Sequence, residues 1–381
     1  MPWWTDRRDA LLALAGERTP RYVYDLDTAR ERARSLRALV PCDRALYAVK
    51  ANGHPALVAA LAGEGLGLEC VSGGEIAHVR EVLPGLNPAE ILYTPNFAPR
   101  DEVAAALAAG VRVTLDNAAT LDAWPEVWAG REVFVRVDPG VGKGHHAHVR
   151  TAGTRSKFGV AAADLAGLAA AARQRGVAVV GLHAHVGSGV ADPAAWAQTA
   201  ATLAAHADAH FPDARVLDVG GGLPVPTGGA APFDLAAAGR ALAAFRARRP
   251  AFEVWVEPGR FLVADAGVLL ARVTQVKRKG RVRFVGLDAG MNSLVRPALY
   301  GAHHDIVNLS RPGAPALGPA EIVGPICESG DAFAHARPFP EATEGDVVLI
   351  DTAGAYGAVM ASGYNRRAPA DEVVVGGSGG S

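Results

Sequence analysis

The sequence is poor in cysteine and has no excess of either charge. Its 381 residues include 3 cysteines, Cys42, Cys70 and Cys327, which are odd in number and far apart. That pattern excludes a disulfide framework and a CxxC metal or redox site. The 38 Lys+Arg nearly balance the 39 Asp+Glu, so the composition does not favour binding to nucleic acid or an anionic membrane. We therefore expect a small-molecule partner and a reducing compartment, the cytoplasm.

Long apolar runs are also missing. No uncharged apolar stretch reaches the roughly 18 residues of a transmembrane helix. The start of the chain, with Asp6 and Asp9 around a short apolar stretch, is unlike a signal peptide. We expect a soluble, unexported protein whose length suggests about two or three domains. The tail GGSGGS, residues 376–381, is typical of an artificial flexible linker and is left outside the fold.

Between residues 45 and 257 a short apolar run, a polar or Gly-rich loop and an Ala-rich helical stretch alternate. The expected strands are ALYAV (45–49), GLECV (67–71), ILYT (91–94), VRVTL (111–115), VFVRV (133–137), VVGLHAH (179–185), VLDVG (216–220) and EVWVE (253–257). Eight strands alternating with helices predict a (β/α)8 TIM barrel. A doubly wound open sheet is less favoured, because no GxGxxG follows the first strand.

After Glu257 the pattern changes to strand-like runs separated by Gly/Pro-rich turns, with little helix between them. This predicts a second, mostly β domain. The early run YVYDL (22–26) precedes the barrel pattern and is expected to pair with that domain. We therefore predict a barrel over residues 27–257 and a β domain made of residues 1–26 plus 258–375.

Four strand ends carry chemically distinctive residues, and in such barrels the active site lies at the carboxyl ends of the strands. They are Lys50 in YAVKAN, His183 and His185 in HAHVGS, Gly220–Gly222 in DVGGG, and Glu257 and Arg260 in EPGR. A pyridoxal phosphate needs a lysine for its aldehyde, backbone amides and an arginine for its phosphate, a flat group against its ring and a carboxylate for its ring nitrogen. Each requirement has a candidate, although every motif taken alone has an ordinary structural reading.

A metal-dependent barrel hydrolase is the competing hypothesis, because His183 and His185 point to the same face of a strand. It leaves Lys50, the glycine run and EPGR without a role. The loop residues His145, His146 and His148 could also bind a metal, but such a Gly-rich loop is more often simply solvated. We therefore predict no metal site.

The chain closely resembles the fold-type III pyridoxal-phosphate decarboxylases, and within them the diaminopimelate decarboxylases. The motifs behind this resemblance are YAVKAN, KFGV (157–160), HAHVGS, DVGGG, EPGR, MNSLVRPALY (291–300), GPICESGD (324–331) and GAYG (354–357). It is most similar to the decarboxylase portion fused to aspartate kinase in some bacteria. The resemblance implies an alanine racemase-like fold and a cytoplasmic homodimer with shared active sites.

The resemblance also implies roles for individual residues. The catalytic residues are Lys50, which binds the cofactor covalently, and Cys327, which donates a proton. The residues that bind pyridoxal 5'-phosphate are Lys50, His185, Ser188, Gly220, Gly221, Gly222, Glu257, Gly259, Arg260 and Tyr356. The substrate-binding residues are Arg260, Arg296, Tyr300, Glu328 and Tyr356. Cys327 and Glu328 are implied to enter the site of the other subunit.

The implied reaction converts meso-diaminopimelate into L-lysine and carbon dioxide, the last step of lysine biosynthesis. An ornithine- or lysine-type decarboxylase of the same fold is the nearest alternative. That group typically has aspartate where this chain has Glu328, and its substrate does not need the arginine of RPALY. A non-catalytic homologue is less favoured, because the chain keeps both Lys50 and Cys327.

Overall fold

The computed structural model describes residues 1–140 and 156–377, and the chain divides into two compact units. The sheet unit consists of residues 1–31, 225–231 and 260–381, and the barrel unit of residues 32–224 and 232–259. The first boundary between them falls inside helix α2 (Leu26–Leu39). Each unit has its own β-sheet.

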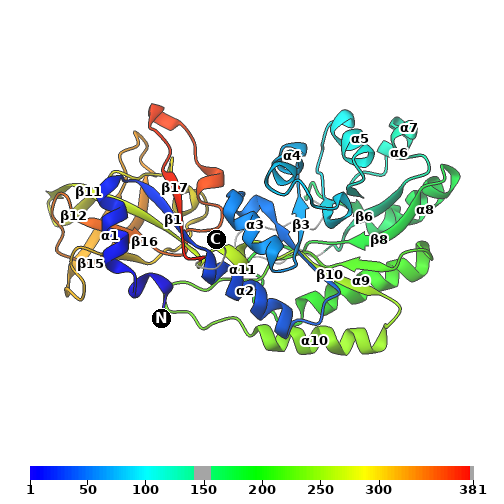
Figure 1. Ribbon diagram of the computed structural model, residues 1–381, viewed down its shortest axis with the longest axis horizontal. Coiled ribbons are helices and arrows are strands. Elements are labelled where there is room, and N and C mark those ends of the chain that lie inside the picture. Colours follow the sequence, from blue (N-terminus) through cyan, green and yellow to red (C-terminus); the bar gives the residue numbers. More distant parts are fainter. Residues whose placement is uncertain (141–155, 378–381) are drawn as a thin grey trace. The chain divides into compact units, whose positions relative to one another are not determined.

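The barrel unit contains a closed ring of parallel strands (Figure 1). Its strands are β2 (Arg44–Ala48), β3 (Gly67–Cys70), β4 (Ile91–Tyr93), β5 (Arg112–Leu115), β6 (Glu132–Asp138), β8 (Ala178–His183), β9 (Val216–Asp218) and β10 (Glu253–Val256). The ring closes where β10 pairs with β2 and where β5 pairs with β6. The predicted (β/α)8 barrel is confirmed, and the open-sheet alternative is wrong. A short strand, β7 (Val160–Ala161), is added beside β6.

Helices lie outside this ring and connect successive strands (Figure 1). They are α3 (Pro55–Gly63), α4 (Gly73–Val82), α5 (Arg100–Ala108), α6 (Thr120–Ala123), α7 (Pro125–Trp128), α8 (Leu165–Gln174), α9 (Ala195–His210) and α10 (Leu235–Arg248). Local sequence sets where they begin. Ser72 caps α4 by accepting a hydrogen bond from the Glu75 amide at 3.1 Å, and Asp234 caps α10 through the Ala237 amide at 2.7 Å. Such caps satisfy amide groups that the first helical turn leaves without partners.

Two layers of side chains fill the inside of the barrel. The lower layer is an apolar cluster of Leu46, Leu92, Phe134, Val216 and Trp255. Side chains two residues apart on a strand point to the same face. The next inward positions, toward the carboxyl ends of the strands, are therefore Ala48, Thr94, Arg136, Asp218 and Glu257; all five are buried and four are polar. The barrel is apolar at its base and polar at the end where the predicted site lies.

The sheet unit is built around a mixed sheet of eight strands. They are β1 (Arg21–Asp25), β11 (Gly267–Lys279), β12 (Val282–Leu287), β13 (Ile306–Asn308), β14 (Ala316–Val323), β15 (Ala332–Pro340), β16 (Val347–Ile350) and β17 (Asp371–Val375). As predicted, the early strand β1 pairs with this sheet, antiparallel to β11 and parallel to β17. Three helices belong to the unit, α1 (Arg8–Glu17), α11 (Arg260–Val263) and α12 (Arg296–Tyr300).

An apolar core joins helix α1 to one face of this sheet. Leu11 and Ala15 on α1 pack with Val23 on β1, Leu270 on β11 and Leu349 on β16. Burial of a leucine side chain stabilises a fold by about 1.5–3 kcal/mol, so this cluster explains why the amino-terminal segment folds with distant parts of the chain. Within residues 1–140 and 156–377, no helix combines the length and the apolar character that crossing a bilayer requires.

Candidate active site

Lys50 lies just beyond the first barrel strand, in a single 3-10 turn over Val49–Ala51. Its Nζ lies 2.7 Å from both carboxylate oxygens of Glu69, which is completely buried on β3. The hydroxyl of Thr94, the residue directly after β4, also donates to Glu69. A buried carboxylate needs a charged partner and hydrogen bonds, and these two groups supply them. The Lys50 amine is therefore held at the carboxyl end of the barrel.

Sequence reasoning missed Glu69, although a signal was present. Glu69 is the only charged residue in the run GLECV, between Leu68 and Cys70. A carboxylate inside a strand that is buried on both faces needs a partner from the barrel interior. That requirement points to a lysine at a neighbouring strand end.

Three buried polar groups meet across the neighbouring strands β8, β9 and β10. His183 Nε2 lies 3.2 Å from Glu257 Oε2, and ligand atoms of His183, Asp218 and Glu257 all lie within 4.8 Å of one another. Burial alone would raise the pKa of Glu257, but His183 and Lys50 together lower it to about 2. Burial and the Glu257 charge raise the pKa of Asp218 well above its usual range. The two neighbouring carboxyl groups are therefore shifted in opposite directions, Glu257 toward its ionised form and Asp218 toward its neutral form.

The cluster can be interpreted in two ways, as a set of ligands for a metal ion or as a partner for a positively charged group of a cofactor. Among the described residues Glu257 Oε1, Asp218 Oδ2 and His183 Nδ1 are buried without a hydrogen-bond partner. The three residues could hold a metal ion, but His185, the second histidine of the metal hypothesis, is not a member of this group.

His185 lies beside the glycine run that follows β9. The Gly221 amide donates to His185 Nδ1 at 3.3 Å, so Nδ1 carries no proton and the ring is neutral. Burial, with the charges of Lys50 and Arg136, lowers the pKa of His185 to about 3, in agreement with that tautomer. A neutral, flat imidazole is therefore fixed at the mouth of the barrel.

The glycines themselves form a close-packed loop that side chains would fill. A Cβ atom would lie 2.6 Å from His185 Nδ1 at Gly220, 2.2 Å from the Glu257 carbonyl oxygen at Gly221 and 2.5 Å from the Gly187 carbonyl oxygen at Gly222. Gly220 and Gly222 also have positive φ, 69° and 90°, a conformation that favours glycine. A side chain at any of the three positions would collide with neighbouring atoms, so this loop requires glycine.

Arg136 on β6 is a second residue that the sequence reasoning did not single out. Its guanidinium lies 4.5 Å from the centre of the Phe158 ring and 3.9 Å from Asp116 Oδ1. Burial lowers the pKa of Arg136, although Asp116 and Glu257 oppose this effect. The residue follows the apolar Phe134 by two positions, so strand alternation could have placed it inside the barrel.

The predicted cofactor-binding residues Ser188 and Gly259 also belong to the barrel unit. The sheet unit holds the remaining predicted site residues. Arg260, at the start of α11, lies 4.7 Å from the centre of the Tyr356 ring. Arg296, at the start of α12, is buried, and its Nη1 donates to His304 Nε2 at 3.1 Å. Burial and the nearby charge of Arg260 lower the pKa of Arg296 to about 10. In the described part of the chain no carboxylate pairs with Arg296, and its Nε is buried without a partner. Arg260 and Arg296 supply the positive charge of this cluster, which also includes Tyr300 on α12. The cluster is suited to binding an anion.

Cys327 and Glu328 lie in an exposed loop between β14 and β15. The buried carboxylate of Asp331 organises the loop by accepting hydrogen bonds from the Ile326 amide at 2.6 Å and the Met291 amide at 2.5 Å. The Cys327 amide donates to Asn365 Oδ1 at 2.7 Å. Cys42, Cys70 and Cys327 are all free thiols. These hydrogen bonds fix the backbone of the loop, and the Cys327 thiol and the Glu328 carboxylate are exposed to solvent.

The other candidate metal ligands of the sequence, His145, His146 and His148, lie outside the described residues.

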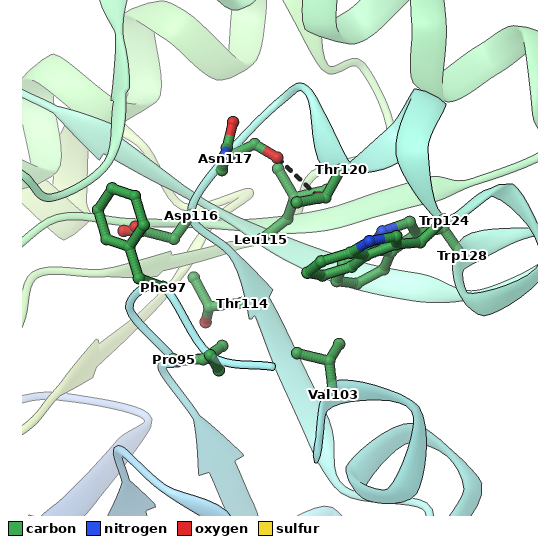
Figure 2. A pocket seen from close by; sticks show the side chains of 11 residues that line it. Pro95, Phe97, Val103, Thr114, Leu115, Asp116, Asn117, Thr120, Trp124 and Trp128 are labelled. Carbon is green, nitrogen blue, oxygen red and sulfur yellow. Dashed lines mark hydrogen bonds between the residues drawn. The ribbon is translucent and has the colours of Figure 1, made fainter. Parts of the chain in front are cut away.

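A separate cavity lies beside the loops after β4 and β5 (Figure 2). Its volume is about 180 Å³, and it is lined by Pro95, Phe97, Ala98, Val103, Thr114, Leu115, Asp116, Asn117, Thr120, Trp124 and Trp128. None of the predicted catalytic or cofactor-binding residues lines it. Both indole rings come from the segment around α6 and α7 (Figure 2).

Comparison with known proteins identifies the class to which this site belongs. Residues 26–264 match the family model for the pyridoxal-binding domain of pyridoxal-dependent decarboxylases. The chain belongs to the pyridoxal-dependent decarboxylase family. It is 38% identical to diaminopimelate decarboxylase of Methanothermobacter thermautotrophicus over 373 residues, covering 94% of this chain and 86% of that protein. The similarity to the kinase-fused form stays a prediction.

Solved structures agree with this assignment. The crystal structure of diaminopimelate decarboxylase from Helicobacter pylori complexed with L-lysine is 29% identical, with a TM-score of 0.87, over 94% of this chain and 92% of that one. Lysine decarboxylase from Selenomonas ruminantium is 27% identical, with a TM-score of 0.82, over 96% of this chain and 95% of that one. The predicted fold and family are confirmed.

The residues of the barrel unit fit the cofactor of this family, pyridoxal phosphate. The unpartnered Glu257 Oε1 can accept a hydrogen bond from a protonated ring nitrogen. The side-chain-free loop at Gly220–Gly222 can accommodate a phosphate against backbone amides. Lys50 brings an amine to the same end of the barrel. Each of these features is one that the cofactor requires.

Proposed function

We propose that this protein decarboxylates meso-diaminopimelate to L-lysine and carbon dioxide. The observation that carries the proposal is the identity of 38% to a diaminopimelate decarboxylase across 94% of the chain, which includes both units. Arg296 supports it, because this residue is buried and no carboxylate among the described residues pairs with it. Such a guanidinium suits a substrate that keeps one carboxylate after losing the other.

In this proposal the barrel unit holds the cofactor. Lys50 binds it covalently through Nζ, His185 packs against its ring, and Glu257 holds a proton at its ring nitrogen. Ser188 and the amides of Gly220–Gly222 bind its phosphate, and Gly259, Arg260 and Tyr356 complete its surroundings. When bound, pyridoxal phosphate supplies an electron-poor ring that takes up the electron pair released as the carbon–carboxylate bond breaks.

The residues of the sheet unit hold the substrate and move a proton. Arg296 and Tyr300 bind the carboxylate that is retained, and Glu328 binds the ammonium at the same end of the substrate. Arg260 and Tyr356 contact the substrate as well as the cofactor. Cys327 Sγ gives its proton to the carbon from which carbon dioxide has left, which completes the exchange of a carboxylate for a hydrogen.

Assembly and location follow from the same proposal. The exposed loop of Cys327 and Glu328 suits insertion into a neighbouring subunit, so we propose a homodimer in which each site uses both chains. The free thiols of Cys42, Cys70 and Cys327 agree with a reducing, cytoplasmic setting.

The test is a substrate comparison on the purified holoenzyme. Equal concentrations of meso-diaminopimelate, L-ornithine and L-lysine are supplied separately, and carbon dioxide and the amine product are measured. We expect turnover of meso-diaminopimelate with equal amounts of L-lysine and carbon dioxide, lost on removal of the cofactor and regained when it is added back. Faster turnover of ornithine or lysine would instead establish a basic amino-acid decarboxylase, and the proposal would be wrong.

A further inference from the structure

A buried hydrogen-bonded chain runs from Arg296 through His304 to the backbone of Asp351. Arg296 Nη1 lies 3.1 Å from His304 Nε2, and His304 Nδ1 lies 2.8 Å from the Asp351 carbonyl oxygen. His304 is 0% exposed and Arg296 is 9% exposed. All three residues belong to the sheet unit.

The partners of His304 determine which ring nitrogen carries the proton. A carbonyl oxygen only accepts hydrogen bonds, so Nδ1 must carry the proton and donate it. A guanidinium only donates, so Nε2 must be unprotonated and accept from Arg296. One neutral tautomer satisfies both partners. Burial and the Arg296 charge lower the pKa of His304 to about 3, so this tautomer persists at neutral pH.

Arg296 depends on this contact for its orientation. Among the described residues His304 Nε2 is its side-chain hydrogen-bond acceptor, while its Nε is buried without a partner. The charge of Arg260 disfavours a second guanidinium nearby. An arginine side chain has many rotamers, and binding a carboxylate through two parallel hydrogen bonds requires one of them. A neutral acceptor fixes the guanidinium without neutralising the charge that would attract the substrate.

We propose that His304 is a positioning residue that orients Arg296 toward the substrate's retained carboxylate, an inference that rests on the function proposed above. His304 touches neither the reacting atoms nor the cofactor in this role. It selects substrates by keeping the carboxylate-binding guanidinium in place. A carboxylate in the same position, by contrast, would form an ion pair with Arg296 and compete with the substrate.

Two substitutions separate the two hydrogen bonds of His304. In His304→Gln the side-chain amide oxygen can take the place of Nε2 and accept from Arg296. In His304→Asn the shorter amide can still donate to the Asp351 carbonyl oxygen but does not reach the guanidinium. The matched control is His303→Asn, because His303 is the neighbouring histidine, is 41% exposed and pairs with Asp305 instead.

The readouts are steady-state kinetics and ligand binding on the holoenzymes. For His304→Asn we expect KM for meso-diaminopimelate to rise about tenfold with kcat within about twofold of the wild type, because a charged hydrogen bond that orients binding is lost. His304→Gln should restore most of the affinity, and His303→Asn should behave as the wild type does. Calorimetry should show about tenfold weaker binding of L-lysine to His304→Asn. Binding of cadaverine, which is lysine without its carboxylate, should be unchanged.

Each result decides between the positioning role and a purely structural one. If His304→Asn leaves both KM and L-lysine binding unchanged, or weakens cadaverine as much as L-lysine, the positioning role is refuted. Equal losses in the Asn and Gln variants would also refute it, because only one of them removes the contact with Arg296. A wild type that is inactive on meso-diaminopimelate would refute the proposed function instead. The lysine and cadaverine measurements need no turnover and would still decide the role of His304.

Discussion

Replacing Glu257 with glutamine tests whether a fixed negative charge at this position drives the reaction. The amide has nearly the same shape as the carboxylate but carries no charge. Glu257 is buried directly after β10, where its Oε2 lies 3.2 Å from His183 Nε2 and its Oε1 has no partner among the described residues. The substitution therefore removes a charge without emptying any volume.

The expected decrease in kcat can be worked out from the surroundings of Glu257. They lower its pKa from 4.5 to about 2, because His183 and Lys50 outweigh the opposing effect of burial. Because this pKa is lowered by folding, the stabilisation is complete above pH 4.5 and is lost as the pH falls toward 2. At neutral pH the carboxylate is ionised. A hydrogen bond to a charged group contributes about 1.5–3 kcal/mol, so Glu257→Gln should lower kcat roughly ten- to hundredfold.

The assay compares kcat, KM and cofactor content at neutral pH. Glu257→Gln should keep its cofactor, because Lys50 and the glycine loop are unchanged, and its KM should stay close to that of the wild type. Glu253→Gln is the matched control, since it makes the same change at the exposed start of the same strand. If Glu257→Gln binds its full complement of cofactor and its kcat stays within twofold of the wild-type value, the role given to this charge is refuted.

Three further predictions concern Lys50, Glu328 and Cys327. Lys50→Ala should fold but lack the absorbance of lysine-bound cofactor. If borohydride reduction attaches the cofactor to another lysine in this variant, the assignment of Lys50 is wrong. Glu328→Asp should raise KM for meso-diaminopimelate roughly tenfold, since a hydrogen bond between charged groups is worth about 1.5–3 kcal/mol; an unchanged KM would exclude that contact. Mixing Lys50→Ala with Cys327→Ala dimers should restore roughly a quarter of wild-type activity, because about half the dimers are hybrids with one intact site each. No recovery, with subunit exchange confirmed by a tag, would exclude shared sites.

The barrel was predictable because its strands are buried on both faces and appear as continuous apolar runs. The run VFVRV, for example, lies within β6. Strand β15 (Ala332–Pro340) was not predicted, although it pairs with β14. Its sequence, AFAHARPFP, contains Pro338 and Pro340, which favour a turn when read locally. β15 lies beside β14 at the end of the strand order, an edge position where a strand tolerates proline, and a local pattern does not show this position.

The same distinction applies to the candidate site, where some residues could be predicted from the sequence and others could not. Lys50, His185 and Glu257 stand in short motifs at strand ends, so their positions follow from the barrel rule alone. Glu69 and His304 stand outside those motifs, and their importance depends on which side chain they meet in three dimensions. The single charge in the buried run GLECV indicated that Glu69 needs a partner, but the sequence does not show which side chain Glu69 or His304 contacts. Tertiary contacts are therefore needed to find the groups that orient the site.

The barrel unit contains groups suited to binding the cofactor, and the sheet unit contains groups suited to binding the substrate. The physical reason is that the charged groups of the two units differ in sign. The barrel interior carries the ionised Glu257 and the neutral His185, which suit a cofactor ring that needs its nitrogen protonated. The sheet unit carries Arg260 and Arg296 close enough for the charge of Arg260 to lower the pKa of Arg296, which suits a substrate anion. Substitutions in the barrel should therefore change kcat for every substrate. Substitutions around Arg296 should change which substrates are accepted, because only there does the charge of the substrate's far end matter.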